Sequence, residues 1–378
     1  MKTAYIVGGY RSAVGKSGKG VFRFTRPDEM GKQVVQHLLK DFPELDTNRI
    51  DDIIVGNATP EAEQGLNLAR MISLMGLNTD KVPGMTINRY CSSGLQSIAL
   101  AKYQIESGAA HCIIAGGVEC MSPIPFGGWR IIPNYDVSKD NSDWYWNMGL
   151  TAEAVADKWN ISREDQDTFA IESYKRSANA WKEGKFDNEV VPINVHGEQF
   201  VTKDEGPRKP DEDKIKSLNP SFLENGTITP ATSSPISIGS SAVLITSKKF
   251  ANSNNLHIRA TIKGRSIAGV DWRKMGMGPI PATNKVLKKT KLNIQDIDII
   301  ELNEAFAAQA LYVIENAQWD QSKINLNGGS IALGHPLGCS GARILTTLLN
   351  VMEQQDVKTG LATMCIGSGQ GIATILER

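Results

Sequence analysis

The chain has 378 residues, of which 41% are hydrophobic and 22% are charged, and its 41 basic and 41 acidic residues give a formal net charge of zero. This composition is typical of an ordinary globular protein and argues against a nucleic-acid groove or a polybasic membrane contact. A chain of this length exceeds what a single hydrophobic core usually organises, so we expect two or three lobes.

The two ends of the chain carry no recognisable targeting signal. The first apolar run stops at Gly8 and Gly9, too early for the core of a signal peptide. The final ATILER has no retention, peroxisomal or prenylation signal. No run approaches the roughly 18 consecutive apolar residues that a membrane-spanning helix needs. We therefore expect a cytoplasmic protein without a membrane partner.

Short apolar runs next to glycine recur along the chain and predict buried strands of a sheet that is covered on both faces. These runs lie at 5–9, 52–57, 112–117, 298–303 and 361–367. Residues 92–106 are apolar nearly all round and predict a buried helix, whereas residues 341–353 carry the single stripe of an amphipathic helix. Alternating strands and helices predict an α/β layered fold.

The two halves of the chain resemble each other, which predicts an internal duplication. IDDIIVGN at 50–57 resembles the start of IDIIELNEAF at 297–306, and a strand, turn, helix and strand follow in both halves. In a rough overlay, Cys91 falls near Gly338 and Cys339. Such a duplication would bring the starts of two related helices face to face.

Between the halves the texture changes to aromatic, glycine-rich and charged stretches, with one helix that Ser162 is expected to cap. We expect an inserted loop-rich domain there, a usual place for substrate contacts. The predicted regions are an N-terminal half at 1–117, the inserted domain at 118–248, and the remainder of the core, mainly the C-terminal half, at 249–378.

The cysteines predict free thiols. They are Cys91, Cys112, Cys120, Cys339 and Cys365. An odd, scattered set without a C-x-x-C pair argues against a disulfide framework and a zinc site. The histidines are few, and none is spaced from a cysteine as metal ligands are. We expect neither a metal nor another cofactor.

Four residues stand where catalytic groups could stand. Cys91 in RYCSSGL follows an apolar stretch and precedes a helix, whose first turn could stabilise a thiolate; the alternative is a buried, inert thiol. His335 lies in the turn-rich GHPLG and could deprotonate Cys91 or serve only the structure. Cys365 in MCIGSGQG could exchange a proton or fill the core. Asn303 in ELNEAF could orient a water or cap a helix.

Five motifs in colinear order resemble the thiolase family, the acetyl-CoA acyltransferases. They are NRYCSSGLQSIALA, IAGGVECMS, ELNEAFAAQ, GGSIALGHPLGCSGAR and MCIGSGQGIA. The resemblance covers nearly the whole chain. It implies a duplicated five-layer α-β-α-β-α fold with an inserted loop domain, a homodimer or homotetramer, and coenzyme A as a substrate rather than a bound cofactor.

The same resemblance implies a role for each motif residue. Cys91 would accept the acyl group, His335 would activate it, and Cys365 would exchange a proton with the α-carbon of the substrate. Asn303 would hold a water that polarises the thioester carbonyl, and the N–H groups of Cys91 and Gly367 would bind the oxygen of the acyl-enzyme. The implied substrate and coenzyme A contacts are Arg208, Ser234, Met148 and Phe306.

Some residues depart from the family pattern. PATSSPISIGSSA at 230–242 has Thr232, Pro235 and Ile238 where the family has Asn, Gly and Asp, and Ser368 interrupts a glycine run. Asn147 stands where many biosynthetic acetoacetyl-CoA thiolases have histidine. This asparagine, together with a segment between CMS and MGL that is shorter than in those tetrameric enzymes, favours a degradative 3-ketoacyl-CoA thiolase of fatty-acid β-oxidation. The alternatives are a short-chain acetoacetyl-CoA thiolase and a thiolase-like protein that binds acyl-CoA or lipid without turnover.

Overall fold

The computed structural model describes residues 3–195, 197 and 199–378. Its central feature is an 11-stranded mixed sheet with the order β11-β12-β13-β10-β1-β9-β5-β3-β4, to which β2 and β6 are attached at β9 and β1. The strands are β1 (Ala4–Ser12), β2 (Gly15–Lys16), β3 (Asp52–Gly56), β4 (Gly84–Ile87), β5 (Cys112–Cys120), β6 (Val190–Val191), β9 (Ser237–Ser247), β10 (Ala260–Gly269), β11 (Ile299–Leu302), β12 (Thr359–Ile366) and β13 (Gln370–Glu377).

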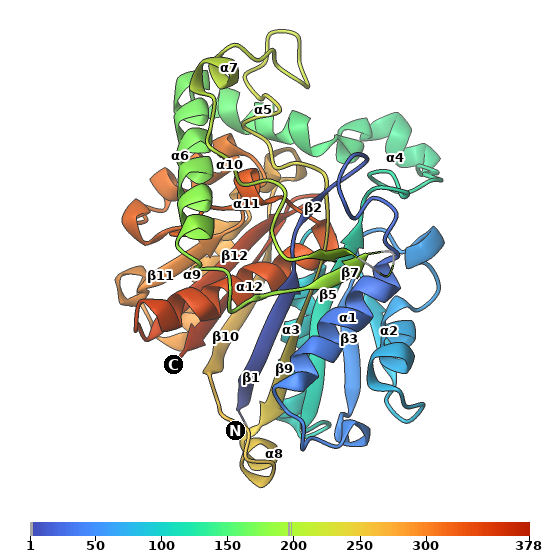
Figure 1. Cartoon of the computed structure of the whole chain (residues 1–378). Helices are drawn as coiled ribbons and strands as arrows, with labels where there is room; N and C mark the ends of the chain where they lie inside the picture. The colour runs from blue at the N-terminus through green and yellow to red at the C-terminus, as the bar shows by residue number, and fades with distance from the viewer. Residues whose placement is uncertain (1–2, 196, 198) are drawn as a thin grey trace.

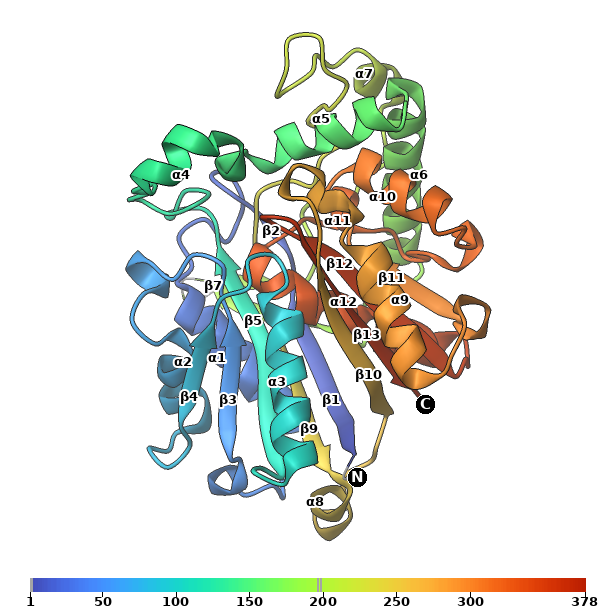
Figure 2. The same ribbon diagram turned by 180° about the vertical axis from the view of Figure 1, so that it is seen from behind.

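The sheet has two halves that meet at a narrow junction. β1 pairs with β10 through only Tyr5↔Thr261 and Ile6↔Ala260, whereas β1 pairs with β9 and β10 with β13 over most of their lengths. The N-terminal half contains β1, β3, β4, β5 and β9, and the C-terminal half contains β10 to β13. Figures 1 and 2 show the blue N-terminal elements on one side of the molecule and the orange and red C-terminal elements on the other.

Helices complete five layers. α3 (Ser93–Ser107) and α12 (Leu337–Gln354) lie between the two half-sheets and share one apolar core with strands from both halves. α1 (Pro27–Lys40) and α2 (Leu68–Leu77) pack on the outer face of the N-terminal half, and α9 (Pro279–Thr290) and α10 (Ala307–Asn316) on that of the C-terminal half. The predicted α-β-α-β-α fold is confirmed.

The burial of these helices follows from their sequences. α12 is buried continuously from Leu337 to Met352 because it has protein on every side. α1, in an outer layer, instead alternates buried and exposed residues and begins with Pro27 followed by Asp28 and Glu29, the residues that suit a helix N-terminus.

The two halves repeat the same order of elements, and the repeat aligns differently from the sequence overlay. α3 begins two residues after Cys91, and α12 begins two residues after His335. Cys91 therefore corresponds to His335 rather than to Gly338 or Cys339. The two equivalent turns, one at the start of each central helix, carry the candidate nucleophile and the candidate base.

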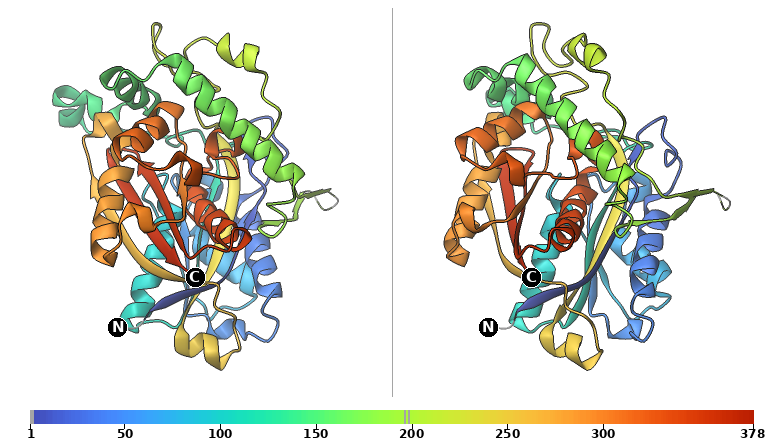
Figure 3. Two further views of the ribbon diagram at one scale, coloured as in Figure 1. Left: turned by 90° about the vertical axis from the view of Figure 1, so that its left-hand side faces the viewer. Right: turned by 60° about the vertical axis from the view of Figure 1, so that its left-hand side comes forward.

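The range 118–248 begins inside β5 and ends just after β9, so it includes the end of β5 and two whole strands of the central sheet, β9 and the short β6. The other elements of this range are α4 (Tyr135–Asp140), α5 (Met148–Lys158), α6 (Arg163–Lys182), β7 (Ile193–Val195), β8 (Gln199–Val201) and α7 (Glu212–Lys216). Ser162 caps α6 as predicted, because its side chain accepts from the Asp165 N–H. Figure 3 shows α6 running diagonally across the outside of the core.

Two short helices remain, α8 (Lys248–Ser253) after β9 and α11 (Ser330–Leu333) ahead of α12. No helix in the described ranges is long and apolar enough to cross a bilayer.

Candidate active site

Cys91 lies in the turn between β4 and α3, where the backbone is held in an uncommon shape. Tyr90 has a φ of 46°, and such a left-handed conformation costs a non-glycine residue about 1–3 kcal/mol. The Ser93 hydroxyl stabilises the turn, since it accepts from the Arg89 N–H at 2.8 Å and donates to the Tyr90 carbonyl at 2.7 Å. The turn places Cys91 in the wall of a cavity of about 320 Å³.

The Cys91 thiol is protonated in the resting protein. Burial raises its pKa to about 11, although the backbone N–H groups of Gly367 and of Cys91 itself oppose this rise, and the charge of Glu119 adds to it. The sequence suggested that the dipole at the start of α3 would stabilise a thiolate. Burial outweighs the effect of that dipole, so the thiol form is favoured. Cys91 needs a base before it can attack a carbonyl.

His335 is positioned to be that base. Ser340 donates its hydroxyl hydrogen to the Pro336 carbonyl at 2.9 Å, so it accepts a hydrogen bond from His335 Nδ1 at 2.6 Å. The proton of the neutral imidazole is thereby assigned to Nδ1, which leaves the lone pair of Nε2 free. Burial and the positive charge of Arg343 lower the pKa of His335 to about 3, so the ring is neutral at pH 7.

Cys365 and Gly367 come from the end of β12 and the turn that follows it. Cys365 lines the same cavity as Cys91 and His335. Burial and then the neighbouring Cys91 raise the pKa of the Cys365 thiol. Ser368 has a φ of 60° in this turn, and the Gly367 N–H is directed at the Cys91 thiol.

Asn303 follows β11 and lies at Nε2 of His335, whereas Ser340 lies at Nδ1. The Asn303 Nδ2 lies 3.5 Å from His335 Nε2, a separation that suits an oxygen atom shared by the two groups better than a tight direct bond. Asn303 is buried and does not cap a helix, since α10 begins four residues later at Ala307.

The structure brings most of the expected substrate contacts to the cavity. Met148 at the start of α5, Phe306 and Ser234 all line it. Arg208 does not. It is exposed and lies over the Tyr174 ring, 4.5 Å from its centroid, in a separate cavity of about 350 Å³. The segment 230–236 contributes to both cavities, so it connects them.

The divergent segment 230–242 is firmly held despite its unusual sequence. The Ser234 N–H donates to the Ala305 carbonyl at 3.0 Å, and the Ala307 N–H donates to the Thr232 carbonyl at 2.8 Å. The Thr232 side chain is buried against Thr229. Threonine thus replaces the family asparagine without loosening the loop beside Phe306.

A second cavity, of about 370 Å³, also reaches Cys91 and was not expected from the motifs. It shares Cys91, Phe126, Met148 and Leu337 with the first cavity and adds Tyr90, Trp144, Tyr145, Trp146, Gly367 and Ser368 among others. The clustering of aromatic residues in 126–146 was the one sequence signal for this cavity. Whether those side chains face Cys91 depends on the path of the loop, which the sequence does not show.

Ser340 is a further residue that sequence reasoning missed. It stands inside GHPLGCSGAR, five residues after His335, and a helix start after Pro336 would have placed it near the imidazole. Among the described residues, no group of His, Cys, Asp and Glu side chains is arranged to hold a metal ion.

Comparison with known proteins agrees with this arrangement. Family models described as "Thiolase, N-terminal domain" and "Thiolase, C-terminal domain" match residues 4–249 and 256–378. The chain is 44% identical to a 3-ketoacyl-CoA thiolase of Bacillus subtilis over 100% of both chains. It is 46% identical to a 3-ketoacyl-CoA thiolase of Psychrobacter cryohalolentis over 100% of this chain and 98% of the relative. The crystal structure of a Bacillus anthracis acetyl-CoA acetyltransferase has a TM-score of 0.91 at 35% identity, covering 100% of this chain and 99% of the other.

Proposed function

The chain belongs to the thiolase family, and from this premise we propose that it is an acyltransferase that cleaves 3-ketoacyl-CoA with coenzyme A to acyl-CoA and acetyl-CoA. The observation that carries the proposal is the convergence of Cys91, His335 and Cys365 on one cavity. A soft nucleophile, a neutral base and a second thiol are the groups that this cleavage needs.

In the first half-reaction His335 Nε2 takes the proton of Cys91, and the thiolate attacks the ketone carbon at C3. The Cys91 and Gly367 N–H groups hold the resulting oxyanion. The bond between C2 and C3 then breaks, and Cys365 donates its proton to C2. Acetyl-CoA leaves, and the acyl group stays on Cys91.

In the second half-reaction the Cys365 thiolate takes the proton of an incoming coenzyme A thiol. The coenzyme A sulfur attacks the acyl carbon on Cys91, and the departing Cys91 thiolate recovers its proton from the imidazolium of His335. Both thiols and the imidazole return to their starting states, and the sequence is ping-pong. These steps are acyl and proton transfers, so we propose that no metal or redox cofactor takes part, and a chelator should leave the rate unchanged.

Coenzyme A is proposed to run from Arg208 along segment 230–236, past Ser234, to Cys91. The positive charges of Arg208, Lys209 and Lys214 line the outer cavity and suit the phosphates of the nucleotide end. The apolar walls of the inner cavity, with Met148 and Phe306, suit the pantetheine arm.

We propose further that the enzyme is a degradative, β-oxidation-type thiolase that accepts longer acyl chains. The support is the second, aromatic-lined cavity at Cys91, which Ser234 does not line and which offers room for an alkyl chain. An acetoacetyl-CoA specialist would have no use for that space.

A homodimer is the proposed assembly. β4 lies at the edge of the sheet, and an unpaired edge favours pairing with a second copy. The nearby Leu66 side chain is fully exposed, which also suits a covered surface. Light scattering of the purified protein distinguishes the dimer from a monomer or tetramer. The five free cysteines support the proposed reducing, cytoplasmic location.

One assay tests the proposed reaction. The protein is incubated with acetoacetyl-CoA or a longer 3-ketoacyl-CoA, each with free coenzyme A, and the loss of enolate absorbance is followed. We expect loss with both substrates. Loss with acetoacetyl-CoA alone would refute the broad chain range, and loss with neither would favour a protein that only binds acyl-CoA.

A further inference from the structure

A buried chain of side chains leads from the active site to a cation inside the protein. Asn303 Oδ1 accepts a hydrogen bond from the Ser330 hydroxyl at 2.6 Å, and Ser330 Oγ in turn accepts from Arg343 Nη2 at 2.7 Å. All three side chains are buried. This series of hydrogen bonds connects Arg343 on α12 to Asn303, whose side chain faces His335.

Arg343 sets the direction of this chain. A guanidinium can only donate hydrogen bonds, so the Ser330 oxygen must accept from it, and the Ser330 hydrogen is free to donate to Asn303. The Asn303 oxygen is then held on the Ser330 side, and its NH₂ group is turned toward His335 Nε2. A flipped amide would place an oxygen against the lone pair of Nε2 and leave Ser330 with donors on both sides.

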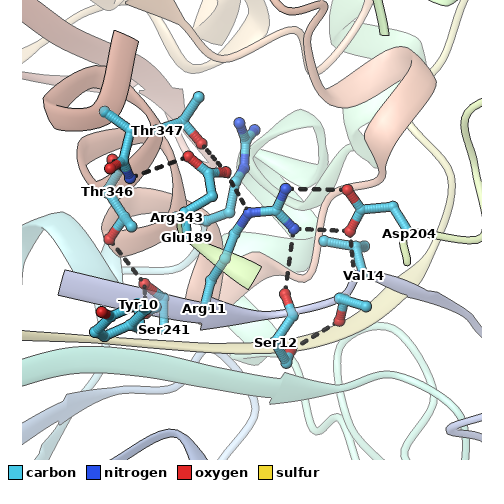
Figure 4. Close-up of polar contacts among 12 residues, drawn as sticks. Tyr10, Arg11, Ser12, Val14, Glu189, Asp204, Ser241, Arg343, Thr346 and Thr347 are labelled. Carbon is cyan, nitrogen blue, oxygen red and sulfur yellow. Dashed lines mark hydrogen bonds and ion pairs between the residues drawn. The ribbon is translucent and has the colours of Figure 1, made fainter. Parts of the chain in front are cut away.

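The surroundings of Arg343 differ from those of an ordinary buried ion pair. Arg11, shown in Figure 4, bonds Glu189 at 2.6 Å and Asp204 at 2.7 and 3.0 Å. Arg343 lies beside this network, but its nearest carboxylate is that of Glu301 at 3.9 Å. Burial raises the pKa of Glu301 to about 8, so this partner is largely neutral at pH 7.

Within the described residues, Nε and Nη1 of Arg343 have no hydrogen-bond partner. In this part of the chain, the hydrogen bond to Ser330 is therefore the one well-formed polar contact of the Arg343 guanidinium. A guanidinium is costly to bury with so few partners. Packing alone does not explain this choice of residue, whereas fixing the direction of a hydrogen bond toward Asn303 does.

We propose that Arg343 and Ser330 are positioning residues that orient the Asn303 amide, with its N–H toward His335, for the cleavage of the carbon–carbon bond. This inference rests on the proposed function. In that reaction the thioester oxygen of the departing acetyl-CoA enolate binds between Asn303 and His335. The oxygen of the acyl-enzyme binds instead at the N–H groups of Cys91 and Gly367. Misorienting Asn303 should therefore slow the first half-reaction and spare acyl transfer between Cys91 and coenzyme A.

The test compares two reactions in the full-length enzyme. The first is cleavage of a 3-ketoacyl-CoA, and the second is exchange of labelled coenzyme A into an acyl-CoA, which needs only the acyl-enzyme. Ser330→Ala should lower the cleavage rate about 10- to 100-fold, as expected for a misplaced catalytic group, and should change the exchange rate less than about twofold. Ser330→Thr retains the hydroxyl and should recover most of the cleavage rate.

A matched control and a double-mutant cycle complete the design. Ser73→Ala in α2 removes a buried hydroxyl that donates to the Val82 carbonyl at 2.6 Å, in an outer layer of the fold, and should leave both rates unchanged. In an Asn303→Ala background, Ser330→Ala should have no further effect on cleavage, because the two residues act through one contact.

Other results overturn the inference. An unchanged cleavage rate in Ser330→Ala, an equal loss in cleavage and exchange, or the same loss in the Asn303→Ala background would each assign Ser330 a structural role only. If the wild-type protein cleaves no 3-ketoacyl-CoA, the proposed function fails and the positioning role falls with it.

Discussion

The contact between the two central helices makes Gly341 a sensitive probe of the site. A Cβ added at Gly341 would lie 2.2 Å from the Leu95 nitrogen and 2.7 Å from Leu95 Cβ, against about 3.5–4.0 Å for an ordinary contact between heavy atoms. Gly341→Ala must therefore push α12 away from α3 by more than about 1 Å at that point, and overpacking of this kind costs about 1–3 kcal/mol.

The separation would also move His335 away from Cys91, since each stands two residues ahead of one of these helices. A misplacement of about 1 Å can cost about 100-fold in rate. Gly76→Ala in α2 is the control, because its new Cβ meets the flexible Val35 side chain at 3.3 Å. Both variants gain the same helix propensity, about 1 kcal/mol, so their difference isolates the helix contact.

The measurements are unfolding in denaturant and rapid-quench acylation of Cys91 by an acyl-CoA. Gly341→Ala should be less stable than Gly76→Ala by about 1–3 kcal/mol and should be acylated at least about tenfold more slowly than wild type. Equal stability and equal acylation in the two variants would show that the close approach of α3 and α12 does not hold the site together.

Further predictions concern the buried thiols and carboxylates. Because the pKa of Cys91 is raised to about 11, its alkylation by iodoacetamide should accelerate about tenfold per pH unit from pH 7 to 9, and a plateau below pH 8 would contradict the thiol assignment. Cys365→Ser should still accept an acyl group on Cys91, detected by mass spectrometry, while carbon–carbon cleavage falls about 100-fold or more; equal loss of both would contradict the proposed proton transfer. Glu189→Gln breaks a buried pair with Arg11 at 2.6 Å and should cost about 3 kcal/mol or more, whereas Glu301→Gln should cost little at pH 7. Since the folded-state pKa of Glu301 is raised to about 8, wild type should lose stability relative to Glu301→Gln as the pH rises from about 5 to about 9; a flat difference in denaturant titrations would argue that Glu301 is ionised.

The periodicity of the sequence predicted the layers of the fold well, because buried strands and helices leave strong apolar patterns. The helix predicted at 92–106 is α3 at Ser93–Ser107. The helix predicted from 341 begins instead at Leu337. The glycines in PLGCSG looked like a turn, but they lie in the first turns of α12. They are required by close approaches: a Cβ at Gly341 would collide with Leu95 of α3, and a Cβ at Gly338 with the backbone of Gly56 and Asn57 and with the Glu119 carboxylate.

The candidate site was predictable where motifs carry the chemistry and not where the tertiary path decides. Cys91, His335 and Cys365 were found by motif, and the structure brings them to one cavity. The roles of Ser330 and Ser340 depend on hydrogen-bond directions that no spacing encodes. The outer location of Arg208 depends on how the inserted segment folds over α6.

The most direct test of the central claim is to locate the acyl group. The protein is mixed with a 3-ketoacyl-CoA without free coenzyme A, quenched in acid, digested and analysed by mass spectrometry. The account predicts one acyl group on the peptide that contains Cys91, with acetyl-CoA released in equal amount, and no acylation in Cys91→Ser. An acyl group on Cys365 or elsewhere, or release of acetyl-CoA without any acylated peptide, would contradict it.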